Sequence, residues 1–268
     1  MVAHFALGHT VNSVPPYLSA LQDLFTSAGA GPLPRGPKFL LFCRGLKRLL
    51  GTADEVVRAR ALSLDDVARI CASLNQRDPA DVGFGLQMIF AFFLALRTED
   101  HTGGRLRWGD VFPQRDGSVE FVLPPGKSVR TFRHVAIADR SDALDPLAWL
   151  RRHASNLPQE ARAFNRPVFV DFAPGRGGVR RFPPLTRSRF IARLKRAVKE
   201  VLGFSPALYA GYSLRRGGVT EMLSRNVPMP VVKAHVGWVP TSDAPNTYYD
   251  HAGHVQMRLP TRALGPAV

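Results

Sequence analysis

The sequence contains little cysteine and no histidine spacing that is typical of a metal site. Only Cys43 and Cys71 occur among the 268 residues, and both stand among apolar neighbours. Two thiols cannot build a disulfide framework or a cysteine-rich zinc site, and they fit a reducing compartment best. The eight histidines are scattered, and no pair of them flanks a glutamate one helical turn apart. We therefore expect chemistry without a metal or any other cofactor.

The sequence also lacks a signal peptide, an internal repeat and an uncharged apolar run long enough to span a bilayer. The run Leu86–Leu96 is apolar on every side, which predicts a fully buried central helix rather than an amphipathic one. Apolar residues make up 45% of the chain, in the globular range, and this excludes wholesale disorder. We expect no membrane partner.

Positive charge is in large excess. Lysine and arginine number 36 against 21 aspartates and glutamates, and the formal net charge is +15. The basic residues are spread along the whole chain, and most of them are arginine. Any single basic run is most simply a solvated face. A globular protein with this total charge most often binds a polyanion, and nucleic acid is the commonest.

Residue patterns predict a mostly helical domain with one small antiparallel sheet. Apolar stripes at helical spacing, and alternation typical of strands, fall in separate segments. Gly29–Pro37 is rich in glycine and proline and predicts a turn. A new unit is expected near Arg58, which divides the chain into residues 1–55 and 56–268. The predicted helices are Val11–Phe25, Phe39–Leu50, Leu86–Leu96, Pro146–His153 and Ser188–Leu202, and the predicted strands are Ser118–Leu123 and Arg133–Ala138.

Two basic residues stand at the ends of these predicted elements. Arg97 directly follows the apolar run, with Asp100 three residues further and Leu106-Arg107-Trp108-Gly109-Asp110-Val111 behind it. Lys127 lies at a Pro-Pro-Gly turn between the two predicted strands. Taken singly, Arg97 is an ordinary helix-ending arginine, and turn lysines such as Lys127 are common on any surface.

The most informative stretch is Tyr212-Ser213-Leu214-Arg215-Arg216-Gly217-Gly218. It places Arg215 in the first turn of a predicted helix, and the two glycines allow tight backbone packing there. An arginine binds a phosphodiester through its planar fork of donors, and a helix N-terminus also attracts anions. Without other signals the stretch is merely the start of an amphipathic helix.

Aromatic residues follow in the last part of the chain. The segment from Val227 to Trp238 ends in Gly-Trp, and Ser242-Asp243 predicts the cap of a short helix before Tyr248-Tyr249. A tyrosine hydroxyl can attack a phosphodiester. Trp238 by itself is most simply a core tryptophan, and His235, three residues earlier, is most simply structural.

In this order, and on these kinds of elements, the motifs resemble the C-terminal half of the tyrosine recombinase, or phage integrase, family from about Leu62 to Tyr249. The Leu-Arg-Arg-Gly-Gly form and Trp238 are most similar to eukaryotic mobile-element recombinases of the crypton or DIRS kind. The resemblance implies the family's catalytic-domain fold, mainly α with a small antiparallel β-sheet. It implies that residues 56–268 form this catalytic domain, and that residues 1–55 are part of a helical core-binding (SAM-like) module.

The resemblance also implies how the basic residues act. Arg97 and Arg215 would be the two phosphate-clamping arginines. Lys127 resembles the hairpin lysine that reaches the leaving 5′ oxygen as a general acid. In the family the acidic residue at the position of Asp100 and the run ending in Asp110 accompany the first arginine, although the gap to Trp108 is longer here than is usual.

The aromatic residues complete the implied site. Tyr212 stands where the family usually has histidine, and Trp238 would donate its indole N–H to the phosphate. Tyr249-Asp250-His251 resembles the family's common Tyr-x-His ending, so Tyr249 is the candidate nucleophile, and Tyr248 is the alternative. Both tyrosines lie slightly farther from Trp238 than in relatives.

Two functions of different class follow from the resemblance. The first is a site-specific recombinase or integrase that cleaves and rejoins double-stranded DNA through a 3′-phosphotyrosyl intermediate, as a homotetramer on paired sites. The second is a catalytically weakened or inactive DNA-binding protein derived from a mobile-element recombinase, which Tyr212, the displaced tyrosines and the thin N-terminal module favour. A type IB topoisomerase would share the chemistry, but the Leu-Arg-Arg-Gly-Gly context favours the recombinase. The expected location is the nucleus for a eukaryotic mobile element, and otherwise the cytoplasm or nucleoid.

Overall fold

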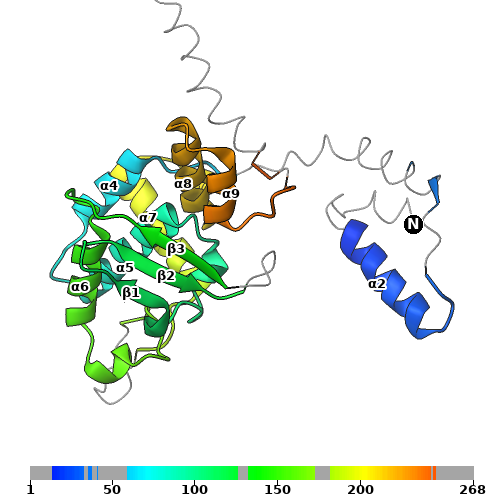
Figure 1. The fold of residues 1–268 in the computed structure, drawn as a ribbon, viewed down its shortest axis with the longest axis horizontal. Coiled ribbons are helices and arrows are strands. Elements are labelled where there is room, and N and C mark those ends of the chain that lie inside the picture. The colour runs from blue at the N-terminus through cyan, green and yellow to red at the C-terminus, as the bar shows by residue number, and fades with distance from the viewer. Residues whose placement is uncertain are drawn as a thin grey trace, which may run out of the picture. The chain divides into compact units, whose positions relative to one another are not determined.

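The computed structural model describes residues 14–32, 36–37, 41, 59–125, 132–172, 182–242 and 244–245. The chain divides into two compact units, Met1–Arg58 and Ala59–Val268. The first unit contains the helix α2 (Val14–Ser27), close to the predicted Val11–Phe25 (Figure 1). The predicted helix Phe39–Leu50 lies outside the described residues except for Leu41. The assignment of this unit to a core-binding module stays a prediction.

The second unit is built around one buried helix, α5 (Pro79–Phe93), in which every residue from Val82 to Phe92 is buried. Its start follows from local chemistry, because the Asp78 carboxylate accepts the Ala80 N–H and Pro79 occupies the first turn. The predicted bounds, Leu86–Leu96, were wrong at both ends, although the predicted burial is confirmed. The helix packs mainly against α6 (Pro146–Ser155) and α8 (Tyr212–Ser224).

The remaining helices cover this core. Helix α4 (Leu64–Ser73) begins with a capping box between Ser63 and Asp66. Helix α7 (Arg187–Leu202) turns its apolar stripe inward and ends at Gly203 in the left-handed conformation. The other elements are α9 (Met229–Val236) and the 3-10 turns η2 (Thr98–Asp100), η3 (Trp108–Asp110), η4 (Gln159–Arg162) and η6 (Pro206–Leu208). Among the described residues, no helix is long and apolar enough to cross a bilayer.

The sheet has three antiparallel strands in the order β1 (Val111–Pro113), β2 (Val119–Leu123) and β3 (Arg133–Ile137). Phe121 opposes Val111 on one side and Val135 on the other. Alternate residues of β2 are buried, and the Phe121 ring meets the Phe90 ring of α5 edge-on at 4.7 Å. The inner face of the sheet therefore packs on α5 (Figure 1). The predicted fold class, mainly α with a small antiparallel sheet, is confirmed.

Candidate functional site

Arg215 lies in the first turn of α8, and its side chain is 0% exposed. Its Nη1 donates to the carbonyl oxygen of Ala95 at 2.5 Å, and its Nη2 donates to the carbonyl oxygen of Val236 at 3.5 Å. The guanidinium thus joins α8 to the turn after α5 and to the last residue of α9. Its Nε–H is buried without an acceptor among the described residues. One donor of this cation is therefore available for a ligand that accepts hydrogen bonds.

Two aromatic rings flank the same guanidinium. The Arg215 Cζ lies 6.0 Å from the centre of the Tyr212 ring and 5.6 Å from the centre of the Trp238 ring. Tyr212 is 40% exposed, so the position that the family usually gives to histidine opens to solvent here. The electron-rich ring faces favour a cation at this distance. The structure therefore brings together three of the residues that the sequence singled out.

Arg97 reaches the neighbourhood of Arg215 through a strained turn. Helix α5 ends at Phe93, and Ala95 then adopts a left-handed conformation, with φ of 47°. This conformation is unfavourable for a residue with a Cβ, and here its carbonyl accepts the Arg215 hydrogen bond. The backbone N–H of Arg97 donates to Asp100 Oδ2 at 2.9 Å, which fixes the following turn η2. Asp100 thus orders the segment that carries Arg97.

The two glycines after Arg215 allow close packing of α8. A Cβ on Gly217 would lie 1.8 Å from the Leu62 carbonyl oxygen, and a Cβ on Gly218 would lie 2.0 Å from the Phe92 carbonyl oxygen. Neither position has room for a side chain, because the obstacle in each case is backbone. The prediction that these glycines serve backbone packing is confirmed.

The C-terminal end of α9 positions Trp238. Gly237 has φ of 74°, its N–H donates to the Ala234 carbonyl, and the Trp238 N–H donates to the Lys233 carbonyl at 2.8 Å. This is the hydrogen-bond pattern with which a left-handed glycine ends a helix. His235 on the same helix donates from Nε2 to the Phe93 carbonyl at 2.7 Å. Burial lowers the pKa of His235, the Phe93 carbonyl opposes this, and the charge of Arg133 lowers the pKa further.

Arg133 is a residue of this neighbourhood that the sequence did not single out. It is the first residue of β3, at the end of the sheet that lies toward α9 in Figure 1. Burial lowers its pKa to about 10, the positive charges of Arg215 and Arg97 lower it as well, and Asp100 opposes them. Strand alternation was the available signal, because it puts Arg133 on the same face as the buried Val135 and Ile137.

The fold is similar to that of solved site-specific recombinases and integrases. The Tn1549 transposon integrase in complex with circular intermediate DNA matches 96% of this chain and 82% of its own, with 12% identity and a TM-score of 0.60. A lambda integrase dimer bound to a COC′ core site matches 92% of this chain and 76% of its own, with 17% identity and a TM-score of 0.55. The chain has the tyrosine recombinase fold.

The similarity is in structure rather than in amino-acid sequence. No protein-family model matches this sequence, and no curated protein matches it either. XerA recombinase is also similar, at 14% identity and a TM-score of 0.53, over 97% of this chain and 85% of its own. The chain spans about half of the XerH recombinase chains that it matches, 49% of one and 52% of another.

Three of the predicted site residues of the recombinase fold, Lys127, Tyr248 and Tyr249, lie outside the described residues. Their roles stay predictions. The short helix predicted before the tyrosines also falls largely outside them, although the Ser242 hydroxyl accepts the Ala244 N–H at 3.2 Å. Trp108, from the run behind Arg97, stacks on His153 with ring centres 6.0 Å apart and packs against both the main core and a smaller apolar cluster.

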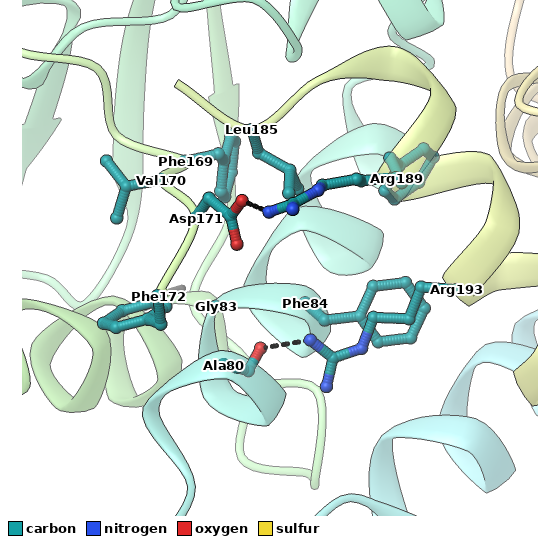
Figure 2. Close-up of a pocket in the computed structure, with 11 residues that line it drawn as sticks. Ala80, Gly83, Phe84, Phe169, Val170, Asp171, Phe172, Leu185, Arg189 and Arg193 are labelled. Atoms are coloured by element: carbon teal, nitrogen blue, oxygen red, sulfur yellow. Dashed lines mark hydrogen bonds and ion pairs between the residues drawn. The ribbon is translucent and has the colours of Figure 1, made fainter. Parts of the chain in front are cut away.

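A cavity of about 190 Å³ in the recombinase fold lies between α5 and α7 (Figure 2). Two arginines of α7 line it, and both are already engaged. Arg193 donates to the Ala80 carbonyl at 2.8 Å and pairs with Asp81, while Arg189 pairs with Asp171. None of the predicted site residues lines this cavity. Among the described residues, no three histidine, cysteine, aspartate or glutamate side chains gather to hold a metal ion.

Proposed function

We propose that this protein is a tyrosine-type DNA recombinase of the integrase family, which cleaves and rejoins double-stranded DNA through a 3′-phosphotyrosyl intermediate. One observation carries the proposal: Arg215 joins the turn before Arg97, the helix start at Tyr212 and the helix end at Trp238 on a recombinase fold. Segments distant in the sequence thus converge on one guanidinium, as a phosphodiester site requires.

In the proposed reaction, Arg97 and Arg215 bind the non-bridging oxygens and stabilise the charge that develops on the pentavalent transition state. The Tyr249 hydroxyl gives its proton to solvent water and forms a bond to phosphorus, and the bond from phosphorus to the 5′ oxygen breaks. Lys127 supplies the proton that the leaving 5′ oxygen takes up. The energy of the broken phosphodiester is kept in the phosphotyrosyl bond, so rejoining to a new strand requires no cofactor.

Double-stranded DNA is the proposed substrate because of charge and because of the structural relatives. The net charge of +15 favours a polyanion. The Tn1549 integrase was solved in complex with circular intermediate DNA, and the lambda integrase dimer was solved bound to a core site. We further propose that four copies assemble on paired sites, since each copy supplies one nucleophile and a complete exchange cuts four strands.

The decisive experiment offers the purified protein a pool of nicked duplexes, from which the cleaved end diffuses away and traps the covalent product. We expect a protein–DNA adduct on a denaturing gel that is lost in Tyr249→Phe and kept in the matched Tyr248→Phe. The opposite pattern would assign the nucleophile to Tyr248. An adduct that survives in both single variants and in the double variant would contradict a tyrosine nucleophile at this position.

A second function, DNA binding without cleavage, is favoured by a specific observation. Arg215 is 0% exposed and donates to two backbone carbonyls, and Tyr212 replaces the usual imidazole with a phenol. A phenol is a weaker proton donor than a protonated imidazole. If duplexes bind the protein in a salt-sensitive way and none forms an adduct, this second function replaces the first.

A further inference from the structure

Gln87 is a polar side chain in the middle of an apolar helix. It is the only polar residue between Val82 and Phe92 of α5, and it is 0% exposed. Its Oε1 is buried without a hydrogen-bond partner among the described residues. A buried amide with an unpaired acceptor costs stability, and an apolar side chain at this position would avoid that cost. The stability of the helix alone therefore does not explain a glutamine here.

The Gln87 amide holds His101 through two hydrogen bonds. Its Nε2 donates to Nδ1 of the His101 ring at 2.9 Å and to the His101 backbone carbonyl at 3.0 Å. Burial lowers the pKa of His101 to about 3, so the ring is neutral and its Nδ1 can accept a hydrogen bond. The ring also meets Phe190 of α7 edge-on, with ring centres 4.8 Å apart. His101 is 1% exposed and is thus fixed in both its ring and its backbone.

His101 follows directly on the turn next to Arg97. This turn is η2, and its first residue, Thr98, is the neighbour of Arg97 in the sequence. The Thr102 hydroxyl donates to the Thr98 carbonyl at 2.7 Å and closes the turn. Thr98 and Thr102 are 4% and 5% exposed, so this hydrogen bond is shielded from water. The stretch from Arg97 to Thr102 is therefore one ordered unit, and His101 ties it to α5.

The other side of this turn lies against the start of α8. A Cβ on Gly211, the residue before Tyr212, would lie 2.2 Å from the Thr98 hydroxyl oxygen and 2.9 Å from the Thr98 Cγ2. A side chain at this position would displace Thr98, so the glycine lets the two segments meet. Arg215, one turn further along α8, donates to the Ala95 carbonyl on the same stretch of chain. The turn is thus held between α5 on one side and the first turn of α8 on the other.

We propose that Gln87 is a positioning residue of this site, which acts through His101 to fix Arg97. The two hydrogen bonds to His101 keep η2 against Gly211, at the start of the helix that carries Arg215. This inference rests on the proposed function, because it gives the two arginines one phosphodiester to bind. In such a site a misplacement of about 1 Å lowers the rate on the order of 100-fold. Gln87 itself is fully buried, so it affects the reaction only through the turn.

The test compares Gln87→Leu with His153→Leu as a matched control. His153 of α6 is also 0% exposed, and it donates from Nε2 to the Val168 carbonyl at 2.8 Å, so its loss removes a buried hydrogen bond outside the turn. Nicked duplexes at saturating concentration give the rate constant of adduct formation and the final amount of adduct. We expect Gln87→Leu to lower the rate constant on the order of 10- to 100-fold, with little change in the Kd for the duplex. His153→Leu should keep the parent rate constant.

The rate constant and the amount of adduct separate positioning from a merely structural role. A variant that only loses folded molecules forms less adduct, while its folded molecules keep the parent rate constant. An unchanged rate constant in Gln87→Leu, or an equal loss in His153→Leu, overturns the inference. The double variant Gln87→Leu/His101→Phe replaces both partners by apolar groups and so leaves neither unpaired. Its rate constant should stay low, and recovery to the parent value also overturns the inference.

Hydrogen exchange distinguishes failure of the proposed function from failure of this inference. The exchange of the amide protons of η2 and His101 in the DNA-free protein reports on the turn whether or not the protein cleaves DNA. We expect faster exchange there in Gln87→Leu and parent-like exchange in His153→Leu. Parent-like exchange in Gln87→Leu overturns the inference even when the parent protein forms the adduct. If exchange rises and the parent forms no adduct, the proposed function fails while the hold of Gln87 on the turn stands.

Discussion

Arg215 illustrates how one residue can serve the fold and the chemistry together. Its hydrogen bonds to the Ala95 and Val236 carbonyls satisfy backbone groups at the C-terminal ends of α5 and α9 that regular helical bonding leaves open. A substitution at Arg215 therefore removes a structural link as well as a charge. Loss of activity in such a variant reports on catalysis only after the folded fraction has been measured.

Gly217 gives a prediction about stability that runs against helix propensity. Alanine in a helix is normally better than glycine by about 1 kcal/mol. Here we expect Gly217→Ala to lower the free energy of unfolding by about 1–3 kcal/mol, because the added Cβ would lie 1.8 Å from the Leu62 carbonyl oxygen and collide with it. Urea denaturation measures this change. Gly36→Ala is the control, since a Cβ there meets nothing within 4 Å. Equal midpoints for both variants would contradict the close packing of α8 on this carbonyl.

His101 gives a prediction about pH. It is fully buried, Gln87 Nε2 donates to its Nδ1 at 2.9 Å, and burial lowers its pKa to about 3 from an ordinary value of 6.5. Between these values the unfolded chain binds a proton that the folded chain does not. Stability is therefore fully present above about pH 6.5 and falls as the pH decreases, by about 1.4 kcal/mol per pH unit for this group.

The measurement is urea denaturation from pH 7 down to pH 4 for the parent protein, His101→Gln and His134→Gln. The slope of the unfolding free energy against pH is proportional to the number of protons taken up on unfolding. This number should fall by about one in His101→Gln, because glutamine has nothing to titrate. His134→Gln is the matched control, because His134 is exposed on β3 rather than buried in the core. His153 is also buried and its pKa is also lowered, so it contributes to the pH dependence that remains in His101→Gln. A parent-like slope in His101→Gln would refute the assignment.

At the scale of elements, the sequence predicts amphipathic helices better than buried ones. The apolar stripes place α6 and α7 within two residues of their observed bounds. Helix α5 has no polar face, so periodicity gives no boundary, and its true start lies at the Asp78-Pro79 cap. Its end is followed by the left-handed Ala95, whose carbonyl accepts a hydrogen bond from the distant Arg215. Strand β1 has three residues and only one of them buried, which leaves no alternation to detect.

In the candidate site too, the sequence identifies residues that lie in local motifs and misses residues whose importance depends on contacts distant in the sequence. Arg97, Tyr212, Arg215 and Trp238 were singled out because each lies in a recognisable local motif. Arg133 was missed because the alternation of β3 puts it on the buried face but does not show which residues of other elements lie near it. Its significance arises only when β3, η2 and α8 are brought together in space, which one sequence does not reveal.

Helix α9 gives a prediction at this scale. It is short, and His235 ties it to the end of α5 through the Phe93 carbonyl at 2.7 Å. His235→Leu removes this bond and leaves the carbonyl without its donor, which costs about 1 kcal/mol. We expect faster amide hydrogen exchange in α9 and at Trp238, with little change in α7. The exposed His134→Leu is the control, and equal exchange in both variants would contradict the link.

At the scale of the whole molecule, the second unit contains its own core. Every buried residue of the main apolar cluster lies between Leu62 and Leu214, and this cluster joins α4, α5, the sheet, α6, α7 and α8. The predicted site is built on the ends of these same elements, so its geometry follows from this core. The unit has an apolar core, and the chain as a whole is strongly cationic. A protein that binds a polyanion needs both, because the core keeps it folded and the positive charge attracts the polyanion.

The net charge of +15 leads to a prediction for DNA binding as a whole. Cations that replace the counterions of DNA release them, so log affinity should fall linearly with log salt. With about six to ten phosphate contacts, affinity would fall roughly 10³- to 10⁵-fold between 50 and 200 mM salt. Fluorescence anisotropy with a labelled duplex of arbitrary sequence measures the slope, and an uncharged peptide nucleic acid duplex of the same sequence is the control. A slope near zero would contradict binding through the phosphate backbone, and with it both functions considered for this fold.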